Sequence, residues 1–120
     1  MKLSTEVLDD NLAEYIQYCL KNSPPFRLYE KGYSLKEFYC HKEGSIYEVN
    51  HIPSGRTVQE FYTEKEAKLF CQMMYFSDLD WDFEDYDITT FSHEQKKLLH
   101  KTFALFSRNQ SLVYHLGCCD

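Results

Sequence analysis

Six carboxylates occur within the ten residues from 78 to 87. No other short stretch of this sequence contains so many side chains that could bind a ligand or take part in a reaction. Aromatic and aliphatic side chains alternate with them. Acids attract a basic protein and rings supply contact area, so this stretch suits a basic partner better than a substrate pocket. We predict a partner-binding site made of Asp78, Asp80, Trp81, Asp82, Phe83, Glu84, Asp85, Tyr86 and Asp87.

The acids of this region hold the whole net charge of the chain. Residues 69–95 contain no Lys or Arg and seven acids, the six above plus Glu94, which gives a charge of -7 against -6 for the entire chain. The remainder is therefore close to neutral. Net acidity argues against a nucleic-acid partner, because phosphate contacts need clustered Lys and Arg.

Calcium is the first alternative for these acids. Asp78, Asp80 and Asp82 have the spacing of the first three ligands of an EF-hand loop. However, Phe83 stands where the sharp turn needs Gly, and Thr89 stands where the bidentate Glu belongs. We therefore predict no metal there.

The acids admit two further interpretations. A glycosidase holds two acids across a cleft, and a single run of acids does not predict that geometry. The other interpretation is a solvated acidic loop that keeps a small domain soluble, in which Trp81 and Phe83 anchor the loop to the core. This second interpretation stays open beside the binding site.

The cysteines and histidines offer weaker chemistry. Cys40 beside His41 places a thiol next to a base, but neighbours on a strand point to opposite faces, so we expect a core thiol and a surface imidazole. His115, Cys118 and Cys119 are three soft ligands, yet adjacent cysteines do not easily point at one metal. Phosphate-loop, dinucleotide and nucleophile-elbow motifs do not occur in the sequence. We expect neither an enzyme nor a cofactor.

Three helices should frame the fold. Ser4 or Thr5 can cap the first helix, which Pro24 ends. Thr63 with Glu66, and Ser92 with its Gln three residues on, are capping boxes that open two more helices. The apolar faces predicted for the three helices are Leu8, Leu12, Ile16, Cys19 and Leu20; Ala67, Phe70, Cys71 and Met74; and Leu98, Leu99, Thr102, Phe103 and Phe106.

Between the first two helices the hydrophobic period changes to two. This pattern predicts strands at 26–31, 34–42, 45–52 and 57–62. A hairpin centred on residues 43–44 would pair Phe38 with Val49, and Cys40 with Tyr47, on a buried face. The predicted fold is one α+β domain over residues 1–120: an antiparallel four-stranded meander, optionally with a fifth C-terminal strand at 111–116, with three helices packed on it. Residues 78–87 should form an extended or irregular connection.

The expected location is the cytoplasm. The first ten residues lack the apolar run of a signal peptide, and no stretch approaches the ~20 apolar residues of a membrane span. Five cysteines, an odd number, are then expected to be reduced thiols.

Residues 55–70, GRTVQEFYTEKEAKLF, resemble the strand-to-helix passage of small bacterial immunity proteins that protect a cell from its own polymorphic toxins. The resemblance covers about an eighth of the chain, and it assigns no residue roles. It implies a cytoplasmic, non-enzymatic inhibitor, often acidic because many of the toxins are basic nucleases.

The expected function is a stoichiometric inhibitor of a cognate toxin. Its acidic stretch would enter the cationic cleft of the toxin, with Trp81, Phe83 or Tyr86 as the buried anchor. The alternative is a regulatory or scaffold module that binds another protein through the polar face of the sheet. That face should carry Glu37, Tyr39, His41, Glu48 and Asn50.

Overall fold

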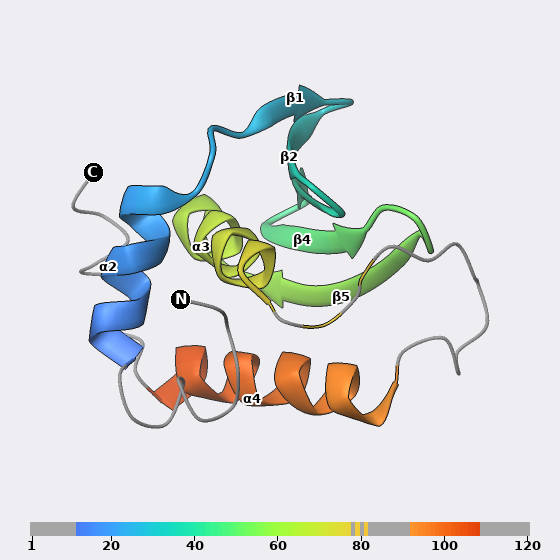
Figure 1. Cartoon of the computed structure of the whole chain (residues 1–120). Helices are drawn as coiled ribbons and strands as arrows, with labels where there is room; N and C mark the ends of the chain where they lie inside the picture. Colours follow the sequence, from blue (N-terminus) through green and yellow to red (C-terminus); the bar gives the residue numbers. More distant parts are fainter. Residues whose placement is uncertain (1–11, 78, 80, 82–91, 109–120) are drawn as a thin grey trace.

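The structure is a computed structural model that describes residues 12–77, 79, 81 and 92–108, with the side chains of 105, 107 and 108 excluded. Five strands pair in chain order to form one antiparallel sheet (Figure 1). They are β1 (Arg27–Tyr29), β2 (Gly32–Leu35), β3 (Phe38–Glu43), β4 (Ile46–His51) and β5 (Arg56–Phe61). The helices are α2 (Leu12–Asn22), α3 (Glu64–Tyr75) and α4 (His93–Arg108). The predicted α+β class, the antiparallel meander and the three helices are confirmed.

The fifth strand arises inside the meander. Residues 34–42, predicted as one strand, contribute to both β2 and β3, because the chain turns at Lys36, whose φ is 57°. A second turn follows Tyr29 at Glu30, with a φ of 50°. Left-handed backbone at a residue other than Gly or Asn is uncommon, so sequence patterns do not signal it. Residues 111–116 lie outside the described residues.

The β3–β4 hairpin has a different register from the predicted one. Cys40 pairs with Val49, and Lys42 with Tyr47, so the turn is made by residues 44 and 45. Gly44 takes the left-handed φ of 63° that this turn needs. The predicted pairing is wrong by two residues. Because side chains alternate with a period of two, the same residues still face the core.

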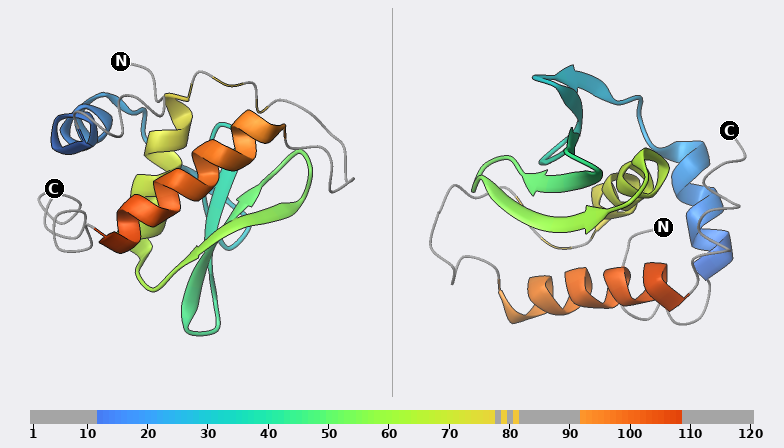
Figure 2. Two further views of the ribbon diagram at one scale, coloured as in Figure 1. Left: turned by 90° about the horizontal axis from the view of Figure 1, so that it is seen from below. Right: turned by 180° about the vertical axis from the view of Figure 1, so that it is seen from behind.

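Helix α3 is the centre of the fold, and the sheet curves around one side of it (Figures 1 and 2). Thr63 caps it as predicted: its hydroxyl accepts from the backbone N–H of Glu66 at 3.2 Å. The same hydroxyl donates to the Glu66 carboxylate at 2.9 Å. The predicted inward face is buried, and its members are Ala67, Phe70, Cys71 and Met74.

The other two helices pack beside α3. Helix α2 buries Ile16 and Cys19 and lies against α3. Helix α4 crosses below β5 in Figure 1, and Phe106 on α4 contacts the rings of Phe61 at 5.2 Å and Phe70 at 6.1 Å between centroids. None of the described helices combines the length and the apolar character needed to cross a lipid bilayer.

Candidate functional site

Within the predicted acidic site, the structure places Trp81 in the protein's own core. Its side chain is 4 % exposed, and its ring meets Phe38 edge-on at 5.3 Å between centroids. Leu79, two residues earlier, is half-buried against the same core. The remaining predicted site residues lie outside the described residues: Asp78, Asp80, Asp82, Phe83, Glu84, Asp85, Tyr86 and Asp87.

His51, at the end of β4, holds Trp81 by its backbone. Nε2 of His51 lies 2.5 Å from the Trp81 carbonyl oxygen, and because a carbonyl only accepts, Nε2 carries the proton. Nδ1 lies 2.7 Å from Oγ of Ser54, so in the neutral ring the hydroxyl donates to Nδ1. Ser54 Oγ also accepts from the N–H of Arg56 at 3.3 Å. The His51–Trp81 hydrogen bond therefore links the end of β4 to the acidic stretch, and the two hydrogen bonds of Ser54 lie within the β4–β5 connection.

A serine and a histidine at this distance could also be a nucleophile and its base. Here the His51 side chain is fully buried, Ser54 is nearly so, and both ring nitrogens are engaged. Neither side chain reaches the surface to meet a substrate. We assign the pair a structural role, which is to hold the position of Trp81.

The sequence prediction did not single out His51. One signal was present: His51 has the same parity along β4 as Val49, which was predicted to be buried, so it had to point inward. A buried histidine needs hydrogen-bond partners. The Trp81 carbonyl, 30 residues further along the chain, could not be identified from the sequence as the partner of His51. No short sequence pattern indicates that Trp81 lies beside β4.

The polar face of the sheet carries four of the five predicted residues, Tyr39, His41, Glu48 and Asn50, which pair across β3 and β4, whereas Glu37 lies in the turn before β3. Asn50 Nδ2 can only donate, so it donates to His41 Nε2 at 3.1 Å. Glu48 and Glu43 place carboxylate oxygens 3.5 and 3.7 Å from the two ring nitrogens. The imidazole stacks on Tyr39 with 4.8 Å between centroids. This face is therefore largely engaged in contacts with itself.

The buried thiols are not arranged as a nucleophile with its base. Cys40 points into the core and His41 points away from it, as expected for neighbours on a strand. Cys40 instead meets the thiol of Cys71 on α3; a hydrogen bond from Cys71 and the nearby Lys68 ammonium lower the Cys40 pKa. Burial raises the pKa of Cys71.

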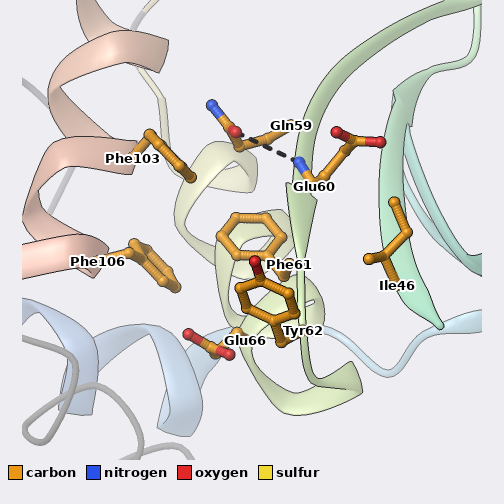
Figure 3. A pocket seen from close by; sticks show the side chains of 8 residues that line it. All are labelled: Ile46, Gln59, Glu60, Phe61, Tyr62, Glu66, Phe103 and Phe106. Carbon is orange, nitrogen blue, oxygen red and sulfur yellow. Dashed lines mark hydrogen bonds between the residues drawn. The ribbon is translucent and has the colours of Figure 1, made fainter.

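A pocket of about 410 Å³ opens between β5 and α4 (Figure 3). Three phenylalanine rings, one tyrosine and two glutamates contribute to its walls. Its lining consists of Ile46, Gln59, Glu60, Phe61, Tyr62, Glu66, Phe103 and Phe106. This volume falls in the range of ~300–1,000 Å³ typical of ligand sites. No lysine or arginine lines it among the described residues.

The described residues contain no cluster of three or more His, Cys, Asp or Glu side chains that could hold a metal ion. The candidate calcium loop that begins at Asp78 lies almost wholly outside the described residues. Comparisons of the chain with models of protein families, with curated proteins and with solved structures found no match.

Proposed function

We propose that this chain is a stoichiometric protein inhibitor, of the kind that immunity proteins represent, and that it binds a basic toxin through the acidic segment, defined as residues 78–87. The observation that carries the proposal is the tethering of this segment at Trp81. The core holds the Trp81 ring, and His51 holds its carbonyl. A tethered anionic segment has less conformational freedom to lose on binding than a free loop of the same charge.

The burial of Trp81 changes which aromatic residues of the acidic segment we propose as anchors in the partner. A ring that fills the protein's own core is not available as an anchor in a partner. Phe83 and Tyr86 are therefore the aromatic anchors we propose. The acids around them would accelerate encounter with a basic surface.

A basic nuclease is the partner class that best fits this charge. Its substrate cleft must be cationic to hold nucleic-acid phosphates. An acidic segment that enters such a cleft would neutralise it and exclude the substrate by occupation. The resemblance of residues 55–70 to immunity proteins supports the same partner class.

The test is a binding measurement with the product of the gene adjacent to the one that encodes this chain. We expect a one-to-one complex by calorimetry, and inhibition of the partner's nuclease activity at equal concentration. Asp80→Asn, Asp82→Asn and Glu84→Gln combined should weaken binding at least about tenfold while the thermal midpoint of unfolding is retained.

A matched control removes the same charge elsewhere. Glu14→Gln, Glu30→Gln and Glu43→Gln combined also remove three negative charges from exposed positions. This variant should bind within about twofold of the wild type, because charges distant from an interface act only through the screened long-range field. Equal weakening by both triple variants would argue that net charge alone matters and that the acidic segment is no interface.

The alternative proposal is a regulatory or scaffold module that binds through the polar sheet face. Tyr39 on this face is only 7 % exposed, and the His41 ring is engaged by Asn50, Glu43 and Glu48. Most polar groups of this face therefore contact one another, and the Oδ1 atom of Asn50 is the buried acceptor on it that has no hydrogen-bond partner among the described residues. His41→Ala would discriminate: loss of partner binding in this variant, with the acidic triple variant unaffected, would favour the module.

A further inference from the structure

The pocket between β5 and α4 contains a carboxylate in an unusual setting. Glu66 is 8 % exposed, although it is a charged residue. Its carboxylate accepts one hydrogen bond from the Thr63 hydroxyl, at 2.9 Å, and has no ion pair within the part of the chain that the structure describes. A buried carboxylate is costly to desolvate unless a cation or several donors satisfy it.

Aromatic rings surround this carboxylate. Phe61 from β5 and Phe106 from α4 are buried, whereas Phe103 is 36 % exposed and Tyr62 is 81 % exposed at the mouth. Figure 3 shows the two α4 rings pointing toward Phe61, with Glu66 below them. The faces of aromatic rings attract cations, and an arginine guanidinium can stack on a ring while it donates to a carboxylate.

The pocket is therefore complementary to a positive group with a flat apolar surface. A second glutamate, Glu60, lies on the exposed rim, and the described residues that line the pocket include no lysine or arginine. A neutral apolar ligand would leave the Glu66 carboxylate without a counter-charge. A phosphate or carboxylate ligand would be repelled by it.

We propose that this pocket receives an arginine side chain of the basic protein partner. The guanidinium would stack on Phe103, beside Phe61 and Phe106, and donate hydrogen bonds to Glu66. This rests on the proposed function for the existence of the partner, but the pocket is separate from the acidic segment in sequence. It adds a short-range, specific contact to the long-range attraction of the acids.

The first arm of the test uses the isolated protein and N-methylguanidinium as the probe. We expect saturable NMR shifts of the amides of Phe61, Glu66 and Phe103. The neutral isostere N-methylurea should produce at most a small fraction of these shifts, because it lacks the charge. Absence of saturable binding, or an equal response to the neutral probe, overturns the proposal.

Variants locate the site. Glu66→Gln should raise the dissociation constant for N-methylguanidinium at least about fivefold, and glutamine can still take part in the cap with Thr63, so folding is retained. Glu64→Gln is the matched control on the same helical turn. Glu64 does not line this pocket, and its carboxylate pairs with Lys68 at 2.9 Å. The control should leave the constant within about twofold. Phe103→Ala should weaken binding by removing the stacked ring.

The second arm measures the same variants against the partner protein. Glu66→Gln and Phe103→Ala should each increase the dissociation rate of the complex at least about tenfold, since short-range contacts act mainly on dissociation. If they leave the complex unchanged, the arginine pocket is overturned. The proposed function would survive that result, provided that neutralising the acidic segment still weakens the complex.

Discussion

At the scale of single residues, His51 has the largest structural consequence. It is a fully buried polar side chain that joins two parts of the chain 30 residues apart. Its two ring nitrogens engage a hydroxyl of the β4–β5 turn and a carbonyl of the acidic segment. His51 therefore fixes the backbone of Trp81 to the end of β4, while the core holds the Trp81 ring.

Replacing His51 by alanine should destabilise the protein by about 2–4 kcal/mol, because it opens a cavity, removes the donor to the Trp81 carbonyl and removes the acceptor for the Ser54 hydroxyl proton. Urea unfolding measures the change. Trp81 is the one tryptophan of the chain, so its fluorescence should also shift to the red in the folded variant. The control His100→Ala, at an exposed position of α4, should change stability by less than about 0.5 kcal/mol. A variant as stable as this control would refute the role given to His51.

The buried thiol of Cys19 should make the free energy of unfolding depend on pH in the alkaline range. Burial raises the pKa of this thiol from 9.0 to about 12. The folded state then keeps the proton that the unfolded state loses, so the contribution is complete below pH 9 and disappears as pH rises toward 12. Stability should fall by up to about 1.4 kcal/mol per pH unit in this window because of this one group.

The test compares the slope of unfolding free energy against pH in the wild type with the slope in the Cys19→Ala variant. Cys19→Ala should reduce the loss of unfolding free energy between pH 9 and pH 11, measured by urea titration at each pH. The loss of stability caused by removing the Sγ atom is the same at every pH, so it does not change the slope. Identical slopes for the variant and the wild type would show that the Cys19 thiol does not retain its proton.

At the scale of elements, the structure shows which local signals suffice. Both capping boxes open helices where the sequence predicts them, and Ser92 and Gln95 exchange two hydrogen bonds at 2.7 and 3.1 Å. These signals are local and unambiguous. The turns at Glu30 and Lys36 were not predicted, because their left-handed backbone is imposed by the sheet and not by the residue type.

The β2–β3 pairing depends on the absence of a side chain at Gly32. A Cβ there would lie 2.1 Å from the Cys40 carbonyl oxygen and 2.9 Å from the Tyr39 ring. Gly32→Ala should therefore cost about 3 kcal/mol or more, as an overpacked site that must move backbone. Urea unfolding and hydrogen exchange of the β2 amides measure this effect.

Gly44 provides the matched control for this substitution. A Cβ at Gly44 meets no atom within 4 Å, so Gly44→Ala carries only the strain of its φ of 63°. That strain should cost about 1–2 kcal/mol. Equal destabilisation by the two variants would contradict the close approach assigned to Gly32.

At the scale of the whole molecule, the sequence predicts more of the fold than of the candidate site. The fold class followed from periodicity and caps, which are properties of short segments. The acidic segment followed from composition, and the charge of -7 that residues 69–95 carry does not depend on structure. The role of Trp81 did not follow, because only long-range packing decides whether a ring among acids faces the core or a partner.

The pocket between β5 and α4 also required the structure. Its two sides come from residues 59–66 and from Phe103 and Phe106, which lie about forty residues apart in the sequence. The pattern predicted both phenylalanines as part of a helical apolar face. It could not show that Phe103 stays partly exposed beside a buried carboxylate, since that depends on how α4 crosses β5.

The most direct test of the proposed inhibitor is the association rate with the neighbouring gene product as a function of salt. Stopped-flow mixing from about 20 mM to about 500 mM NaCl spans Debye lengths from roughly 20 Å to 4 Å. If the acidic segment steers encounter, the rate constant should fall at least about tenfold over this range, and the Asp80, Asp82 and Glu84 triple variant should show a much flatter dependence. A rate constant independent of salt, or a triple variant with the same slope as the wild type, would contradict the proposal that residues 78–87 bind the partner.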